Sequence, residues 1–189
     1  MITVVTGFTR SGTSLMMQML HRGGMDVYAE NHYSYETPET MTLPRRIKWL
    51  DRVEGRAIKM LEPLEFYPPK NRAYRFILMT RKPEEQAKSQ VKFMHAASPG
   101  VIKCSDNQAI QTLAASIRRD TPKAVKFLQT YTESTLIEIS FESLIDDPFE
   151  TACRVSDFCG GLNVKAMVEQ VIRRSSDCLP YLLETVERR

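Results

Sequence analysis

Three short runs of consecutive apolar residues stand out along the chain, and polar or turn-forming residues bound each of them. They cover residues 2–6, 74–80 and 136–141. Runs of this length are typical of strands that are buried on both faces of a parallel sheet. Shorter apolar stretches at residues 25–28 and 56–60 predict two further short strands.

Between these strands the apolar residues recur at helical spacing. The first predicted helix covers residues 13–22 and stops at a Gly-Gly pair. A threonine followed by proline predicts that a second helix starts at residue 37 and continues through Trp49 to about residue 55. The later predicted helices cover residues 83–95, 106–119, 120–131, 143–159 and 163–174. Pro122 and the two residues before it are expected to end one of these helices and begin the next.

The alternation of strands and helices predicts an α/β fold, with a central, mostly parallel sheet flanked by helices. A chain of 189 residues is long enough for one core, and no linker-like stretch divides it. We therefore expect residues 1–189 to form a single domain.

Composition limits the classes of partner. Apolar residues make up 42% of the chain and charged residues 26%, as is usual for a folded globular protein. The net charge of +3 is too small for the dense basic surface of a nucleic-acid-binding protein, so no nucleic acid is expected. It does suit one polyanionic ligand bound in a cleft.

The cysteines and the N-terminal segment indicate a cytoplasmic protein without a metal. None of the four cysteines forms a Cys-x-x-Cys pair, and the chain has three histidines, which argues against zinc sites and disulfide frameworks. The first strand is not preceded by the basic and long apolar regions of a secretory signal. No apolar run approaches the ~20 residues of a membrane span, so no membrane insertion is expected.

Residues 7–14, Gly-Phe-Thr-Arg-Ser-Gly-Thr-Ser, have the frame of a phosphate-binding loop between a buried strand and a helix. In such loops, glycines let successive backbone N–H groups converge on one anion at the positive end of the helix dipole. Thr13 stands where nucleotide hydrolases and kinases have a lysine. The cation of this loop is Arg10, which is suited to grip a terminal phosphate or sulfate.

A second candidate anion site follows the strand at residues 74–80. Arg81 lies at the carboxyl end of this strand, where the ligands of parallel α/β sheets collect. Pro83 begins the next helix, and Ser89 lies about two turns into it. An arginine and a serine near a helix start can share one phosphate.

These motifs resemble those of the sulfotransferases that use 3′-phosphoadenosine 5′-phosphosulfate (PAPS). Residues 9–14 are similar to the family's 5′-phosphosulfate loop, and Arg81, Pro83 and Ser89 have the spacing of its 3′-phosphate motif. Residues 141–148 are similar to its segment Tyr-Glu-Asp-Leu/Met-x-x-Asp-Pro. The resemblance covers most of residues 1–160 and is closest to short bacterial sulfotransferase-like proteins. It implies a three-layer P-loop fold and the donor-binding residues Gly7, Arg10, Ser11, Gly12, Thr13, Ser14, Arg81 and Ser89.

On the acceptor side, residues 56–63 resemble the family segment Arg-x-x-Lys-Thr-His-x-Pro. The resemblance implies that Lys59 approaches the transferring sulfuryl group together with Arg10. Leu61 occupies the place of the family's histidine, so that base cannot be carried over. Glu36, Glu62 and His32 are the candidate substitutes. Glu36 ranks first because it lies in an amphipathic cluster with two tyrosines.

The resemblance therefore implies a PAPS-dependent sulfotransferase that releases PAP (3′-phosphoadenosine 5′-phosphate), needs no metal, and uses a small-molecule or glycan acceptor. A P-loop kinase or nucleotide hydrolase is an alternative, but Thr13 argues against it. A catalytically inactive nucleotide-binding protein of the same fold is a second alternative. Leu61 favours this reading, as does the lack of the Arg-Lys-Gly loop that closes over the nucleotide in the animal enzymes.

Overall fold

The computed structural model describes residues 1–30, 34–37, 39–40 and 47–171. The strands are β1 (Ile2–Gly7), β2 (Ala57–Leu61), β3 (Tyr74–Thr80) and β4 (Thr135–Ser140). They form one sheet in the order β2-β1-β3-β4, and every neighbouring pair is parallel. β1 is therefore an inner strand, with Val5 opposite Lys59 on one side and opposite Ile77 on the other.

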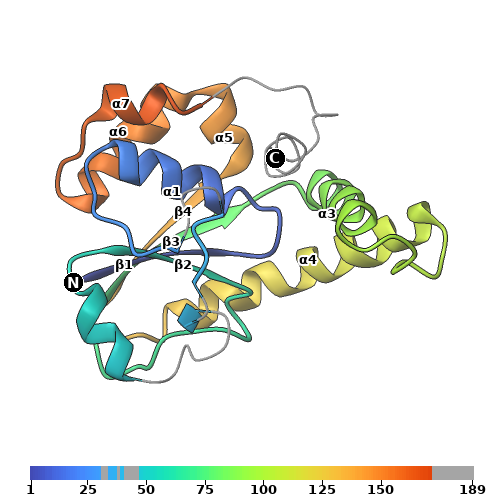
Figure 1. The fold of residues 1–189 in the computed structure, drawn as a ribbon, viewed down its shortest axis with the longest axis horizontal. Coiled ribbons are helices and arrows are strands. Elements are labelled where there is room, and N and C mark those ends of the chain that lie inside the picture. The colour runs from blue at the N-terminus through green and yellow to red at the C-terminus, as the bar shows by residue number, and fades with distance from the viewer. Residues whose placement is uncertain (31–33, 38, 41–46, 172–189) are drawn as a thin grey trace.

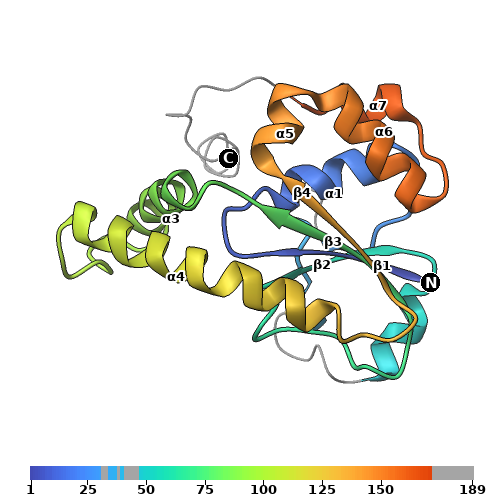
Figure 2. The ribbon, with the colours of Figure 1, turned by 180° about the vertical axis from the view of Figure 1, so that it is seen from behind.

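Helices cover both faces of this sheet (Figures 1 and 2). The helices are α1 (Thr13–Arg22), α3 (Pro83–Ala97), α4 (Asp106–Leu128), α5 (Phe141–Asp146), α6 (Pro148–Cys159), α7 (Val164–Val168) and the 3-10 helix η1 (Ile47–Val53). The helices α1, α5, α6 and α7 lie over one face, and α4 and η1 lie over the other. The predicted three-layer α/β fold with a parallel sheet is confirmed.

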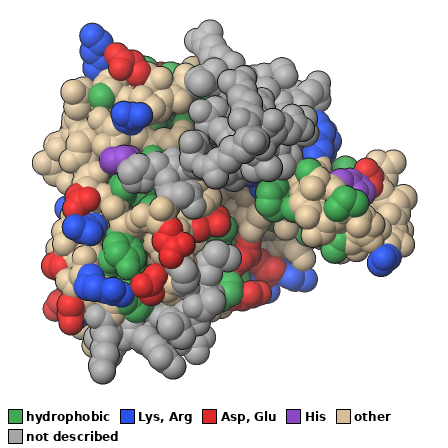
Figure 3. Space-filling view, viewed as in Figure 1, with side chains coloured by type: hydrophobic (Ala, Val, Ile, Leu, Met, Phe, Trp, Pro, Cys, Tyr) green, Lys and Arg blue, Asp and Glu red, His purple; other side chains and the backbone are tan. Residues whose placement is uncertain are grey.

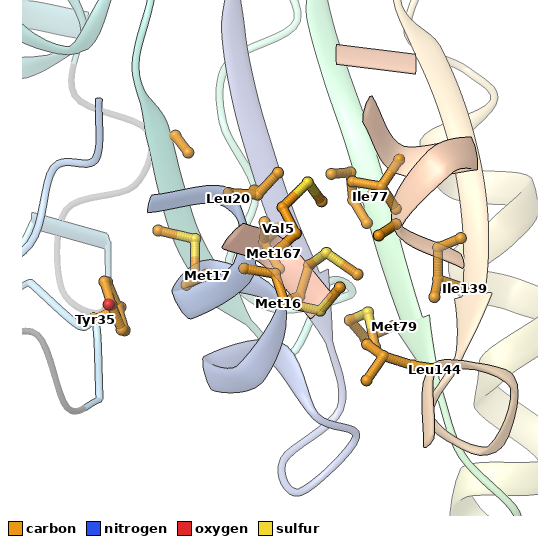
Figure 4. Close-up of a cluster of buried hydrophobic side chains, with 14 residues drawn as sticks. Val5, Met16, Met17, Leu20, Tyr35, Ile77, Met79, Ile139, Leu144 and Met167 are labelled. Atoms are coloured by element: carbon orange, nitrogen blue, oxygen red, sulfur yellow. The ribbon is translucent and has the colours of Figure 1, made fainter. Parts of the chain in front are cut away.

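The two faces of the sheet build separate apolar cores, because successive strand residues point to opposite sides. Val5, Ile77 and Ile139 pack beneath α1 and α7 in a core rich in methionine, which Figure 4 shows. Val4 and Phe76 point to the other side, into a core that includes residues of η1 and α4. A tightly buried sheet of this kind fixes where the strand ends, and therefore the site, lie in space.

Several predicted boundaries need correction. α4 is one helix and is not interrupted at Pro122, because Ala114, Ile117, Ala124 and Leu128 form a single buried stripe along it. Near Pro122, the Thr121 hydroxyl donates to the Ile117 carbonyl at 2.8 Å. Where one helix was expected at residues 143–159, the structure has two.

The break between α5 and α6 has a local cause. Asp147 ends α5, and its carboxylate accepts from the Glu150 N–H at 3.0 Å, which caps α6 with Pro148 in its first turn. The expected strand at residues 25–28 is reduced to a single bridge between Val27 and Ala57. Residues 38 and 41–46 of the second predicted helix, and 172–174 of the last, lie outside the described residues. None of the described helices is both long and apolar enough to cross a membrane.

Candidate functional site

The candidate site lies at the edge of the sheet where all four strands end. The loop between β1 and α1 begins at Gly7, where a Cβ atom would lie 2.5 Å from the Met79 carbonyl oxygen. Gly12 caps α1 in a left-handed conformation, with φ of 103°, and a Cβ atom there would lie 2.6 Å from the Phe141 ring. Both positions therefore require glycine for this close packing.

Residues of other elements hold the loop from outside. A carboxylate oxygen of Glu62, just after β2, accepts from the Thr9 N–H at 2.8 Å and from the Thr9 hydroxyl at 2.7 Å. The side-chain amide of Gln86, on α3, donates to the carbonyls of Phe8 at 3.1 Å and Thr9 at 2.9 Å. The sequence analysis did not find Gln86, because a glutamine in a helix carries no local signal of a partner 77 positions earlier.

Arg10 lies at the tip of the loop with a positive φ of 71°. Its Nε donates to the Ser89 hydroxyl at 3.2 Å, and its guanidinium lies 5.5 Å from the centre of the Phe93 ring. Burial, with a smaller contribution from the positive charge of Arg81, lowers the pKa of Arg10 to about 10. The structure thus brings the predicted loop cation to the predicted serine of the second anion site.

Arg81 completes this group from the end of β3. Its Nη1 donates to the Arg10 carbonyl at 3.4 Å, and its guanidinium lies 4.5 Å from the centre of the Phe141 ring. The Arg81 Nε atom is buried without a hydrogen-bond partner among the described residues. Burial lowers the pKa of Arg81 as well. Within the described part of the chain, neither Arg10 nor Arg81 forms a salt bridge, but the Glu142 and Glu85 carboxylates oppose the lowering of the Arg81 pKa, so the positive charge of the group is partly compensated.

Lys59 lies on β2 beneath the start of α1 and is 3% exposed. Its ammonium donates to the Ser14 hydroxyl at 3.0 Å, the Ser34 carbonyl at 2.7 Å and the Glu36 carboxylate at 2.8 Å. Burial lowers the pKa of Lys59, and the Glu36 carboxylate opposes this shift. Glu36 is about one-third exposed, so this pair joins a buried cation to a carboxylate that solvent reaches.

The three candidate bases have different positions. Glu36 contacts Lys59, whereas Glu62 is occupied with Thr9. His32 lies outside the described residues.

Ser11 and Thr13 are buried in the loop, and no described residue bonds the Ser11 hydroxyl.

A cavity of about 170 Å³ lies beside the loop, between the segment after β2 and the helices α3 and α4. Its walls are partly apolar, from Phe8, Leu64, Leu113 and Ile117, and it also contains the Glu62 side chain. In the space-filling view, the charged side chains in the middle of the face are mostly acidic (Figure 3).

Comparisons with known proteins identify the fold. No protein-family model and no curated protein sequence matches the chain. Among solved structures, the mouse sulfotransferase SULT7A1 in complex with PAP is similar, with a TM-score of 0.66, 14% identity, and coverage of 93% of this chain and 63% of that one. Retinol dehydratase in complex with androsterone and PAP gives a TM-score of 0.58 at 13% identity, covering 90% of this chain and 64% of that one.

The sulfotransferase domain of the olefin synthase from Synechococcus is similar over more of its own length. The TM-score is 0.53 at 16% identity, with coverage of 97% of this chain and 82% of that domain. This chain thus spans less than two-thirds of the first two proteins. With its parallel sheet and its phosphate loop after β1, the chain has the fold of the sulfotransferases.

Proposed function

We propose that this protein transfers a sulfuryl group from PAPS to a hydroxyl or amine of an acceptor and releases PAP. The observation that carries the proposal is the group of Arg10, Arg81 and Ser89, which joins the phosphate loop to the end of β3. Two adjacent guanidinium groups without a carboxylate between them are suited to a ligand with more than one anionic group. PAP is present in two of the similar structures.

In this proposal the two anion sites divide the donor between them. The loop from Gly7 to Ser14 holds the 5′-phosphosulfate at the start of α1 through Arg10 and its backbone N–H groups, apart from those of Thr9 and Ser11, which donate to Glu62 and Phe8. Arg81 and Ser89 hold the 3′-phosphate. The hydrogen bond between Arg10 and Ser89 supports this division, because one donor molecule carries its 5′-phosphosulfate and 3′-phosphate on the same ribose.

The chemistry assigned to Lys59 and Glu36 follows from their ion pair. A lone pair of the acceptor oxygen or nitrogen forms the new bond to sulfur, while the sulfur–oxygen bond to the phosphate breaks and its electrons stay on PAP. Glu36 takes the proton of the acceptor. Protonation of Glu36 removes the negative charge that compensates Lys59, just as negative charge builds on the leaving phosphate. The positive charge of Lys59 can then stabilise the negative charge on the leaving phosphate.

In this proposal the reacting hydroxyl or amine reaches Glu36 outside the cavity between the loop and the helices α3 and α4, because Glu36 does not line it, and the rest of the acceptor occupies that cavity. Its apolar walls suit a small molecule with an apolar part, and a glycan is the alternative occupant. Glu62 lines the same cavity and is the second candidate base. The two hydrogen bonds that Glu62 receives from Thr9 favour a role in holding the loop.

The donor site is tested by calorimetric titration with PAP and with ATP, each with and without magnesium. We expect micromolar binding of PAP that does not depend on the metal, and much weaker binding of ATP. Binding of ATP that requires magnesium, without a preference for PAP, would assign the protein to the kinases or hydrolases. Binding of PAP without transfer to any acceptor in a broad screen would support the inactive nucleotide-binding protein, which Leu61 favours.

Replacing Arg10 by alanine will weaken PAP binding by about 10- to 100-fold, because a hydrogen bond to a charged group contributes roughly 1.5–3 kcal/mol. Calorimetric titration with PAP measures this loss of affinity. Arg154→Ala is the matched control, since Arg154 is an exposed arginine on α6 and its removal changes the net charge equally. Equal affinities of the Arg10→Ala variant and the parent protein would refute the role given to the loop cation.

A further inference from the structure

We propose that Gln86 is a positioning residue that sets the shape of the phosphate loop before the donor binds, although it lies behind the loop. This inference rests on the proposed function, because it assigns the 5′ end of the donor to the loop. The Gln86 side chain is 1% exposed and reaches the loop from α3. Ser89, assigned to the other end of the donor, lies on the same helix.

The contacts of Gln86 use its donor capacity fully. A glutamine amide nitrogen carries two N–H groups. In this structure the nitrogen donates to two successive loop carbonyls, those of Phe8 and Thr9. The carbonyl of the next residue, Arg10, accepts from Arg81. Three consecutive carbonyls of the loop are therefore turned toward β3 and α3.

The direction of these carbonyls has a consequence for the N–H groups. In a trans peptide, the C=O and the following N–H point in opposite directions. The bond from Gln86 to the Thr9 carbonyl therefore turns the Arg10 N–H away from α3, and no described residue accepts from that N–H. The left-handed conformation of Arg10 is sparsely populated in free chains, so it needs support from outside the loop.

Gln86 also ties the two halves of the donor site together. It joins the loop to α3, while the Arg10 side chain bonds Ser89 on the same helix. If the Gln86 bonds are lost, Arg10 keeps its charge and the bond from Arg81 to its carbonyl, but the peptide between Thr9 and Arg10 loses its support from α3. Recognition of the 5′ phosphate then weakens, whereas Arg81 and Ser89 can still bind a 3′ phosphate.

The experiment compares Gln86→Leu with Gln90→Leu, which changes a glutamine one turn further along α3 that lines the cavity. Calorimetry with PAP, adenosine 5′-phosphate and adenosine 3′-phosphate gives the affinities. We expect Gln86→Leu to weaken binding of PAP and adenosine 5′-phosphate by about 10-fold, as for two neutral hydrogen bonds, and to change that of adenosine 3′-phosphate less than about twofold. Equal losses for all three ligands, or none, would overturn the inference.

Hydrogen exchange and the Gln86→Glu variant separate the role of Gln86 from a general loss of stability. Hydrogen exchange is also independent of the proposed function. Hydrogen exchange in the ligand-free protein should become faster in the loop at residues 8–14 for Gln86→Leu and remain unchanged for Gln90→Leu. If the parent protein does not bind PAP, the proposed function fails, and unchanged loop exchange would overturn the role of Gln86 as well.

The Gln86→Glu variant adds a test based on the pH dependence of PAP affinity. Its carboxylate has the same shape but, when ionised, repels the Phe8 and Thr9 carbonyls, and burial raises the pKa of such a group. Once protonated it can donate one hydrogen bond. The PAP affinity of this variant, relative to the parent protein, should therefore rise as the pH falls. A ratio that does not change with pH would contradict a hydrogen-bonding role.

Discussion

Replacing Lys59 by methionine will lower the rate of sulfuryl transfer by about 100- to 1,000-fold, which is the usual loss when one group that stabilises transition-state charge is removed. Methionine has a similar length and suits the buried position of Lys59, so the fold should persist. The measurement is the rate of PAP formation from PAPS with the best acceptor found by screening. PAPS affinity should change much less than the rate, because the negative charge on the leaving phosphate develops only as the sulfur–oxygen bond breaks.

Lys126→Met is the matched control, since Lys126 is an exposed lysine on α4. Hydrolysis of PAPS by water supplies a readout that does not depend on the acceptor, and it should fall together with transfer. A folded Lys59→Met variant that transfers sulfuryl groups at the parent rate would contradict the role of Lys59. A variant that loses rate and PAPS affinity in equal measure would instead make Lys59 a donor-binding residue.

Replacing Glu36 by glutamine will lower transfer to an un-ionised hydroxyl by about 100- to 10,000-fold, the range expected for loss of a general base. The glutamine oxygen can still accept from Lys59, which lies 2.8 Å from the carboxylate, so the geometry of the pair is retained. The effect should be much smaller with a phenol that is already ionised at the assay pH, because no proton has to be removed. Rates with both kinds of acceptor therefore separate proton transfer from positioning.

Glu62→Gln serves as the comparison, because Glu62 is the other described candidate base. Its amide oxygen can still accept from the Thr9 N–H and hydroxyl, so Glu62→Gln should change transfer to both kinds of acceptor little and equally. If Glu62→Gln shows the dependence on acceptor ionisation and Glu36→Gln does not, the base is Glu62 and our assignment is wrong.

The sequence predicted the strands well because each buried strand is a compact apolar run, and both faces of the sheet are covered. It predicted the loop between β1 and α1 because the glycine spacing is local, and phosphate binding by this loop stays a prediction. The continuation of α4 through Pro122 was not predicted. The buried side chains along α4 determine that the helix continues, and the local rule that proline ends a helix does not apply here. The helix break at Asp147 follows a local rule that was available, an acidic cap followed by proline.

Contacts between distant segments were the hardest to predict. The pairing of Arg10 with Ser89 joins residues 79 positions apart, and that of Lys59 with Glu36 joins residues 23 apart. A resemblance in motifs assigned Arg10 and Ser89 to two anion sites, for the 5′ and 3′ groups of one donor, but did not indicate that the two residues touch. Gln86 was not predicted at all, because it contacts only backbone carbonyls, and nothing in the loop sequence requires a glutamine.

The inner position of β1 has a consequence for the newly made chain. β1 is synthesised before the other described strands, yet its partners are β2 and β3, with Ile2 opposite Tyr74. Pairings between such distant segments form slowly, because the intervening chain must first be ordered. The phosphate loop follows β1 directly. Its carbonyls accept hydrogen bonds from Gln86 and Arg81, which come after β3 in the chain. A ribosome must therefore release the chain past α3 before the nascent protein can acquire its affinity for a nucleotide.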